Sequence, residues 1–327
     1  MTSISVVIPV YRAEMTLRRL YAELRPELES LGGPFEVIFV EDCGGDGSWA
    51  VIQALAAADP RVRGIRLNRN FGQHNALLCG IRQAGNDVIV TMDDDLQHPV
   101  SEIKHLLAAL DNETDVVYGS PHQQQHGLLR DMASQMTKLA LATAMGAETA
   151  RNVSAFRAFR THLREGFRDY RSPWVSIDVL LTWSTTRFRC VRVTHAPRTA
   201  GVSGYTARKL VAHALNLMTG FSTLPLQIAS FVGFGFVLMG VLVMVYVLVG
   251  YLVHGSAVPG FAFLASIITI FSGAQLFALG IFGEYLARMH FRSMDRPPYV
   301  VRDGTEARGE AGMPPVTRAE QAAPRHV

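Results

Sequence analysis

The stretch from Leu210 to Gly283 contains no Asp, Glu, Lys or Arg, and this constrains the fold more than any other feature of the chain. Two long apolar runs lie within it, at residues 228–253 and 261–279. A transmembrane helix needs about 20 predominantly apolar residues. The alternative is a pair of buried helices in a soluble core, which these lengths and the complete lack of charge disfavour. We therefore predict two transmembrane helices, at about 228–253 and 261–283.

Basic residues flank the outer ends of these two runs, whereas the connection between them, residues 254–260, has no Lys or Arg. Cytoplasmic flanks of membrane helices carry an excess of Lys and Arg. The pattern predicts a multi-pass hairpin with both chain termini in the cytoplasm. The flanking residues are Arg208, Lys209, Arg288, Arg292 and Arg296. Glycines within the hairpin permit close helix contact, which is compatible with a homo-oligomer.

Outside this stretch the composition is that of an ordinary globular domain. The net charge of +3 is too small to indicate a nucleic-acid partner, so we expect none. The three cysteines, Cys43, Cys79 and Cys190, are far apart and match neither a disulfide framework nor a zinc site. Free thiols are typical of a reducing compartment.

Short apolar runs alternate with helical patterns through the first 120 residues. Continuous Val and Ile runs separated by helices are typical of a mostly parallel α/β sheet with helices on both faces. The predicted strands are 3–10, 35–40, 62–67, 87–92, 116–118 and 188–194, and the predicted helices are 15–30, 48–58, 73–84, 99–110, 128–144 and an amphipathic 207–218. Ligands of such sheets lie at the carboxyl ends of the strands, so a site is expected after Val10, Val40, Leu67 and Met92.

Three acids, Asp93, Asp94 and Asp95, directly follow the predicted strand 87–92. Three carboxylates at one strand end repel one another unless a cation is present, and hard cations such as Mg²⁺ or Mn²⁺ take oxygen ligands. Asp93 and Asp95 can point the same way and share a metal with a bound phosphate, and Gln97 can add an amide oxygen. The alternative is a solvated acidic turn that caps the next helix.

Glu41 and Asp42 follow the second predicted strand, in Glu-Asp-Cys-Gly-Gly-Asp-Gly-Ser. A carboxylate here can accept a hydrogen bond from a nucleobase or a ribose, while the glycines predict a turn before a helix. The same loop matches G-x-G-x-x-A, but Asp46 would repel a pyrophosphate, so we reject a dinucleotide site. After the third strand, residues 68–76 are rich in amides and begin a helix. The amino end of a helix favours a bound anion. The alternative is a polar turn that only caps the helix.

Several basic residues after the first third of the chain, all arginines, are candidate phosphate ligands, although spacing alone favours ordinary surface positions for them. They are Arg130, Arg157, Arg160 and Arg198. Asp178 is ambiguous in the same way. The histidines His74, His98 and His195 have no partner spacing that indicates a metal site or a triad, and no G-x-S-x-G, P-loop lysine or paired-cysteine motif occurs.

Taken together, these stretches resemble the membrane-bound family 2 glycosyltransferases that load sugars onto polyprenyl phosphate. The family includes enzymes similar to dolichyl-phosphate mannose synthase, and the resemblance is closest to the bacterial undecaprenyl-phosphate 4-deoxy-4-formamido-L-arabinose transferases. It covers about residues 3–300. The stretches that carry it are VVIPVYRAE, VEDCGGDGS, LNRNFGQHNALLCG, TMDDDLQHP and the two apolar runs.

The resemblance implies a GT-A nucleotide-diphospho-sugar transferase fold plus a C-terminal transmembrane hairpin. It implies a cytosolic catalytic domain at 1–205, an amphipathic interfacial segment at 206–225, two transmembrane helices within 226–286, and a cytosolic basic segment with a disordered tail at 287–327. The implied enzyme lies in the bacterial inner membrane. It moves a sugar from a UDP- or GDP-sugar to polyprenyl (undecaprenyl) phosphate with inversion, for cell-envelope glycan or lipid modification, using Mg²⁺ or Mn²⁺.

The residues and the resemblance together assign roles to particular positions. Nucleotide-sugar binding is expected of Pro9, Tyr11, Glu41, Asp42, Asn70, Gln73 and Asp94. Metal binding is expected of Asp93, Asp95 and Gln97, and catalytic roles of Asp93, Asp95, Arg130 and Arg198. Contacts with the lipid phosphate are expected of Arg157, Ser203, Tyr205, Arg208 and Lys209.

Two positions depart from the family pattern. Arg12-Ala13 replaces a common Asn-Glu, so the usual glutamate contact is missing unless Glu14 supplies it. Gly204 replaces a phosphate-binding lysine, for which Lys209 or Arg208 is a substitute. Both departures bear on donor or acceptor specificity.

The implied chemistry agrees with the absence of an evident general base. A phosphate monoester has a second pKa of about 6, so near pH 7 its oxygen is already an anionic nucleophile. Two other functions remain as alternatives. A processive polysaccharide synthase would need more spans and usually a Q-x-x-R-W motif, and the chain has no Arg-Trp pair. A non-catalytic membrane scaffold would have no need of Asp93, Asp95 and Gln97.

Overall fold

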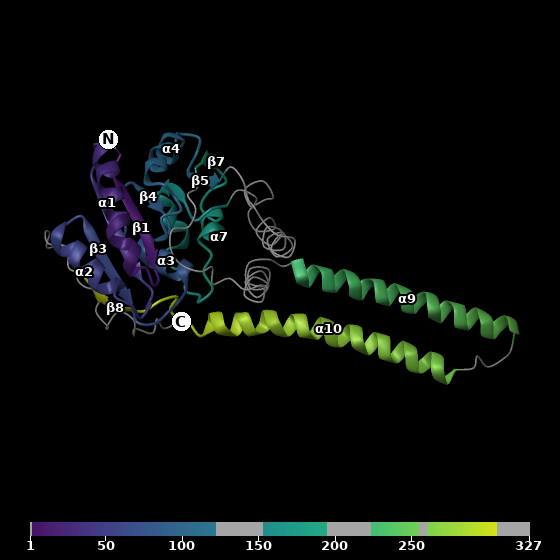
Figure 1. Ribbon diagram of the computed structural model, residues 1–327. Coiled ribbons are helices and arrows are strands. Elements are labelled where there is room, and N and C mark those ends of the chain that lie inside the picture. The colour runs from purple at the N-terminus through teal and green to yellow at the C-terminus, as the bar shows by residue number, and fades with distance from the viewer. Residues whose placement is uncertain (1, 122–152, 195–223, 255–259, 306–327) are drawn as a thin grey trace, which may run out of the picture.

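The computed structural model describes residues 2–121, 153–194, 224–254 and 260–305. Within these ranges an α/β body carries a long hairpin of two apolar helices that projects from one side (Figure 1). The predicted helices 128–144 and 207–218 lie outside the described residues. The predicted domain boundary at 205/206 also lies there, so it stays a prediction.

The described strands form one eight-stranded sheet in the order β7-β5-β6-β4-β1-β2-β3-β8. Their bounds are β1 Ile4–Val10, β2 Phe35–Glu41, β3 Val62–Leu67, β4 Val88–Thr91, β5 Val116–Pro121, β6 Arg157–Arg160, β7 Phe188–Val193 and β8 Val301–Gly304. The pairs β1–β2, β1–β4, β2–β3 and β5–β7 are parallel. Among the described strands, antiparallel pairing is confined to the pairs that β6 and β8 make. The predicted mostly parallel sheet is confirmed.

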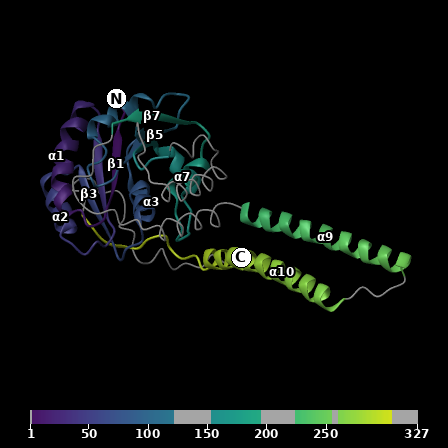
Figure 2. The same ribbon diagram turned by 45° about the vertical axis from the view of Figure 1, so that its right-hand side comes forward.

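Helices cover both faces of this sheet. One face carries α1 (Glu14–Ser30), α2 (Ser48–Ala58), the 3₁₀ turn η1 (Val100–Glu102) and α4 (Ile103–Ala108), whereas the other carries α3 (Gln73–Gln83), the 3₁₀ helix η2 (Thr161–Phe167) and α7 (Ile177–Thr182). Successive residues of β1 serve opposite faces, because Val6 and Ile8 pack in the first cluster and Val7 in the second. This two-sided burial explains the continuous apolar strands. Figure 2 shows the same layers turned by 45°.

The predicted hairpin is formed by α9 (Leu224–His254) and α10 (Phe261–Ser293). Each contains a segment that is long and apolar enough to cross a bilayer, at Leu226–Gly250 and Ile270–Phe291, and neither segment is buried in the protein. Phe236 and Phe271 meet edge to face between the two helices, with ring centroids 5.7 Å apart. Large apolar side chains elsewhere on the hairpin are exposed, as a lipid-facing surface requires.

The sequence did not predict two of the strands. β6 is only four residues long and begins and ends with arginine. β8 lies in the segment 287–327 that we predicted to be a basic segment with a disordered tail. Residues 301–304 instead pair antiparallel with β3, and flanking bonds run from Asn68 N to Val300 O and from Thr305 N to Gly64 O, both 2.9 Å. A four-residue edge strand, Val-Arg-Asp-Gly, whose residues are all exposed has no hydrophobic periodicity by which it could be predicted.

Candidate active site

A pocket of about 220 Å³ lies at the carboxyl ends of β1, β2, β3 and β4. This is the edge of the sheet where the sequence predicted a site. Its lining comprises Pro9, Val10, Tyr11, Asp42, Asn70, Gly72, Gln73, Asp93, Asp94 and Asp95. The structure therefore brings together six of the seven predicted nucleotide-sugar ligands and two of the three predicted metal ligands, Asp93 and Asp95, from four different strand ends.

The three acids after β4 have different surroundings. Asp93 accepts a hydrogen bond from Gln73 Nε2 at 2.6 Å, and Asp95 accepts one from the backbone N–H of Gln97 at 3.2 Å. Asp94 accepts one from the backbone N–H of Tyr11 at 3.0 Å, which ties β1 to this loop. Burial raises the pKa of Asp94 to about 7, and the charges of Asp93 and Asp95 add to this effect. The middle acid is thus a structural link between two strand ends.

The donor set fits a hard divalent cation. Asp93 and Asp95 supply carboxylate oxygens beside an open pocket, and carboxylates are the ligands that Mg²⁺ and Mn²⁺ prefer. Within the described part of the chain, no three His, Cys, Asp or Glu side chains form a metal cage. A cation held here would need further oxygens from a ligand such as a diphosphate. Gln97 does not line the pocket, and it bonds Asp95 through its backbone N–H, so its predicted metal contact stays a prediction.

Asp42 and Glu41 differ in position although they are neighbours in the sequence. Asp42 lines the pocket and accepts bonds from the backbone N–H groups of Phe71 and Gly72, at 2.7 and 2.8 Å. Burial raises the pKa of its carboxyl group, against the opposing effect of these two bonds. Glu41 is directed away from the pocket to Gly44 N and Arg66 Nε, at 2.6 and 3.1 Å. Of the two predicted acids, the structure places Asp42 in the pocket and gives Glu41 a supporting position behind it.

The backbone around the pocket adopts unusual conformations. Left-handed φ values occur at Arg12 (57°), Cys43 (54°) and Leu96 (61°), each just after a strand that ends at this edge, and Gly72 has a φ of 96° after β3. Such conformations cost non-glycine residues about 1–3 kcal/mol and cluster at functional sites. The strained backbone therefore lies at the same edge of the sheet as the carboxylates, which supports a functional site there.

Arg12 and Glu14 mark the departure from the family pattern. Arg12 Nε donates to Gly44 O at 3.1 Å, and its guanidinium lies 5.3 Å from the centroid of the Tyr11 ring. Glu14 accepts a bond from the backbone N–H of Gly47 at 3.0 Å, in the loop after β2. The side chain of Glu14 therefore supports that loop and does not line the pocket, so it does not supply the missing contact in this conformation.

Arg157 is placed differently from a surface phosphate ligand. It lies on β6 beside Thr91, only 1% exposed, and its guanidinium forms an ion pair with the buried Asp178 of α7. The hydroxyl group of Tyr118 also bonds Asp178, at 3.1 Å. Contact with a lipid phosphate would need this guanidinium to turn from Asp178, so that role stays a prediction. The role of Asp178 could not be decided from the sequence, because no nearby residue indicates that its partner is Arg157 on β6.

The remaining predicted ligands lie outside the described residues. They are Arg130, Arg198, Ser203, Tyr205, Arg208 and Lys209. Conversely, the sequence missed Val10 and Gly72 as lining residues. The sequence signal for Gly72 is the glycine itself, since glycine easily adopts the positive φ of 96° found there.

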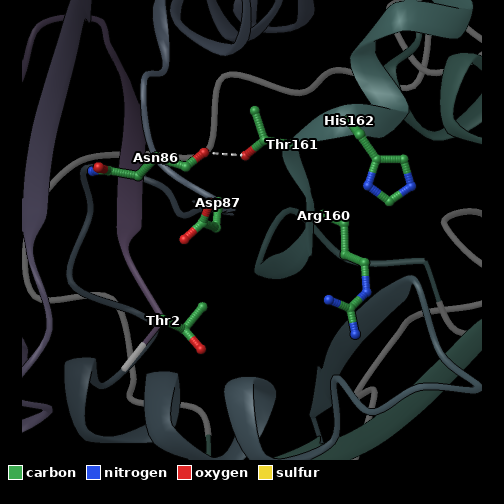
Figure 3. Close-up of a pocket in the computed structure, with 6 residues that line it drawn as sticks. All are labelled: Thr2, Asn86, Asp87, Arg160, Thr161 and His162. Atoms are coloured by element: carbon green, nitrogen blue, oxygen red, sulfur yellow. Dashed lines mark hydrogen bonds between the residues drawn. The ribbon is translucent and has the colours of Figure 1, made fainter.

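A larger cavity of about 570 Å³ lies at the opposite edge of the sheet, near the start of β1 and β4 (Figure 3). Its lining residues are Thr2, Asn86, Asp87, Arg160, Thr161 and His162. The Asp87 carboxylate accepts a hydrogen bond from the Ser3 hydroxyl, and the Thr161 hydroxyl donates one to the backbone oxygen of Asn86. The described residues that line this cavity include no pair of carboxylates, and the cavity lies at the amino ends of the parallel strands. The smaller pocket is therefore the stronger candidate.

Comparison with known proteins agrees with this geometry. Residues 5–170 match the family model described as glycosyl transferase family 2. The chain belongs to glycosyl transferase family 2. This family 2 glycosyltransferase is 33% identical over 303 residues to an undecaprenyl-phosphate 4-deoxy-4-formamido-L-arabinose transferase of Shewanella sediminis, with 92% of each chain covered. It is 35% identical to the enzyme of that name from Pseudomonas paraeruginosa, with 91% of this chain and 89% of the relative covered.

A solved structure supports the fold of the glycosyltransferase. The chain is similar to glucosyl-3-phosphoglycerate synthase from Mycobacterium tuberculosis, crystallised with Mn²⁺, UDP and phosphoglyceric acid. The TM-score is 0.50 at 17% identity, and the match covers 67% of this chain and 76% of the other. At this identity the likeness concerns the fold alone, and it confirms the predicted GT-A architecture.

Proposed function

We propose that this chain transfers a sugar from a UDP- or GDP-sugar to polyprenyl phosphate, undecaprenyl phosphate in bacteria, with inversion at the anomeric carbon. The observation that carries the proposal is the Asp93/Asp95 pocket in a chain that also carries two membrane-length helices. The relatives named for transfer onto undecaprenyl phosphate, similar over nine-tenths of the chain, support this acceptor.

The donor would occupy the pocket at the strand ends. We expect Asp42, Asn70 and Tyr11, which line this pocket, to contact the nucleoside, and Asp93 and Asp95 to hold the cation that accompanies the diphosphate. When bound, Mg²⁺ or Mn²⁺ would neutralise the charge of the departing nucleoside diphosphate. Gln73 orients Asp93 for this task through its 2.6 Å bond. Arg130 and Arg198 are proposed to stabilise the same leaving group.

The acceptor needs little activation. An oxygen of the lipid phosphate attacks the anomeric carbon while the bond from that carbon to the diphosphate oxygen breaks, and the nucleoside diphosphate leaves with the electron pair. Since the phosphate monoester is already anionic near pH 7, no protein base has to remove a proton. Arg157, Ser203, Tyr205, Arg208 and Lys209 are proposed to bind this phosphate.

The proposed location is the bacterial inner membrane, with the body and both termini on the cytosolic side. Nucleotide sugars and the headgroup of the lipid meet at that surface. The product would serve cell-envelope glycan or lipid modification.

Incubation of the purified protein in lipid nanodiscs with undecaprenyl phosphate, Mn²⁺ or Mg²⁺ and a panel of UDP- and GDP-sugars tests the proposal. We expect a glycosylated monophosphate lipid with one sugar per chain and an inverted anomeric configuration. Transfer onto a growing glycan would instead favour a processive synthase. Absence of any transfer with every donor, from protein that binds no donor by calorimetry, would contradict the proposal.

A further inference from the structure

Helix α10 is longer than a bilayer requires. Its 33 residues span about 50 Å at 1.5 Å per residue, whereas the hydrocarbon core is about 30 Å thick. Hydropathy alone places the span at Ile270–Phe291, but that window contains Glu284 and Arg288. The charge-free part from Phe261 to Gly283 is itself long enough, and charges are costly inside a membrane. We therefore place the membrane boundary near Gly283, so that Glu284–Ser293 emerges as an unbroken helix.

This emerging part of α10 is held against the body. Figure 1 shows it running past the beginning of α9 to reach the α/β body. Arg288 pairs with Glu284 at 2.7 Å, and its guanidinium lies 5.1 Å from the ring centroid of Trp174. Phe291 meets the same tryptophan edge to face at 5.5 Å. Trp174 of the body thus contacts two side chains that lie three residues apart on α10.

The chain after α10 continues this attachment. Asp295 pairs with Arg171 at 2.9 Å. The buried amide of Asn75 donates to Pro298 O at 2.8 Å and to Pro173 O at 3.1 Å. The segment then joins the sheet as β8. Residues 294–305 therefore fix the end of α10 to the body at three places, which are Arg171, Asn75 and β3.

Asn75 links this attachment to the candidate active site. It lies on the first turn of α3, two residues after Gln73, whose side chain lines the pocket and bonds Asp93. His74, between them, accepts a bond from the N–H of Ile177 at the start of α7. A short run of side chains therefore connects the helix that leaves the membrane to the carboxylate predicted to hold the cation.

We propose that Glu284–Ser293 and the attached segment 294–305 act as a fixed-length spacer that sets the height of the Asp93/Asp95 pocket above the bilayer. This inference rests on the proposed function, because a fixed height matters only when the acceptor phosphate is confined to the headgroup layer. Displacement of a reacting group by even about 1 Å can cost about 100-fold in rate. A rigid helix with anchored ends meets this requirement, whereas a flexible linker would not.

A length change in α10 tests the spacer. Seven polar helix-forming residues inserted after Gly283 would raise the body by about 10 Å and, since seven residues are close to two full turns, would turn it by only about 20°. The matched control carries the same seven residues after Gly260, at the far end of α10. Each protein is assayed in nanodiscs with undecaprenyl phosphate, and in detergent with a short, water-soluble prenyl phosphate.

For the Gly283 insertion we expect kcat/KM with the bilayer acceptor to fall by about 100-fold. Donor binding by calorimetry and transfer to the soluble acceptor should remain within about twofold of wild type, since neither depends on height. The Gly260 insertion should keep both activities. Equal activity of the two insertion proteins towards the bilayer acceptor would overturn the spacer. If instead the wild-type protein used neither acceptor, the proposed function itself would fail.

A second variant covers the case in which the insertion disrupts folding. Trp174→Ala combined with Phe291→Ala loosens α10 from the body without a change of length. We expect a selective loss with the bilayer acceptor, smaller than that of the insertion, with the soluble acceptor unaffected. An equal loss with both acceptors would mean that these contacts only stabilise the fold, and would overturn the spacer.

Discussion

The α/β body and the hairpin are both built from apolar runs, yet they place those runs in opposite surroundings. Every residue of β1 is buried, between helices on both sides of the sheet. On α9, Phe231 is 76% exposed and Leu242 is 62% exposed. The difference lies in the length of each run, because seven residues make a strand within a core, whereas more than twenty uncharged residues match a bilayer. Hydrophobicity alone does not show whether a segment faces protein or lipid.

The largest expected difference between the body and the hairpin is in the effect of substitutions on the transfer rate. Asp93→Ala and Asp95→Ala should each lower the transfer rate by about 1,000-fold, because the leaving diphosphate would lose its cation. Leu242→Ala on the hairpin should leave the rate unchanged. A radiolabelled sugar-transfer assay in nanodiscs measures both. Asp111→Asn, at an exposed carboxylate paired with Arg189, is the matched acidic control. Full activity of both pocket variants would contradict the assigned site.

The second contrast concerns stability. Leu24→Ala should lower the free energy of unfolding of the body by about 2–5 kcal/mol, because Leu24 is fully buried and its truncation leaves a cavity. Leu242→Ala makes the same chemical change on a side chain that we assign to lipid, and should cost the body nothing. Denaturant unfolding followed by tryptophan fluorescence compares them. Equal destabilisation of the body would show that Leu242 packs against protein.

A smaller effect should depend on pH and be confined to the body. Hydrogen bonds from Arg61 hold the pKa of Asp59 well below its usual range, and the hydroxyl of Tyr21 adds a further bond of 2.7 Å. A lowered pKa in the folded state stabilises the fold above the unfolded pKa of about 3.9, and this stabilisation is lost as the pH falls below that value. Thermal unfolding between pH 6 and pH 3, a range set by that pKa of about 3.9, should show it.

Asp59→Asn serves as the variant for this measurement. It should be less stable than wild type by about 1–3 kcal/mol at pH 6, because Arg61 loses its charged partner. It should also lose less stability than wild type on acidification. Parallel pH profiles for the two proteins would show that Asp59 does not contribute to the acid sensitivity.

The smallest expected effect is a difference in thiol reactivity within the body. Burial raises the pKa of Cys79 to about 12, and Tyr299 of the C-terminal segment lies beside it. Cys190 is exposed on β7. A maleimide should label Cys190 readily at pH 7.5 and leave Cys79 unlabelled until the protein unfolds, as mass spectrometry of peptides would show. Rapid labelling of native Cys79 would mean that the C-terminal segment leaves the body often.

The sequence predicted those parts of the fold that carry a local periodicity. The strands and helices through residue 84 agree with the structure to within about one residue, because each has a complete apolar face of its own. The predicted helix 99–110 is instead a 3₁₀ turn followed by the short helix Ile103–Ala108. β8 was missed because its partner, β3, is more than 200 residues away and its four exposed residues form no apolar pattern.

The candidate site was predictable as a set of residues but not as a set of contacts. The carboxylates after β2 and β4 are visible in the sequence because strand ends of a parallel sheet meet at one edge. That Asp42 enters the pocket while Glu41 turns to Arg66 depends on the register of β2 with β3. The Gln73–Asp93 bond and the Arg157–Asp178 pair likewise join residues that are about 20 positions apart. No local pattern encodes such pairs.

The position of β8 at the end of the sheet has a consequence for truncated forms of the protein. β3 would otherwise present a row of free backbone N–H and C=O groups, and such edges recruit strands from other molecules. A chain that stopped before Val301 would retain the pocket and the membrane helices but would expose this edge. The few residues after the membrane hairpin thus also protect the catalytic body from edge-to-edge aggregation with other copies of the chain.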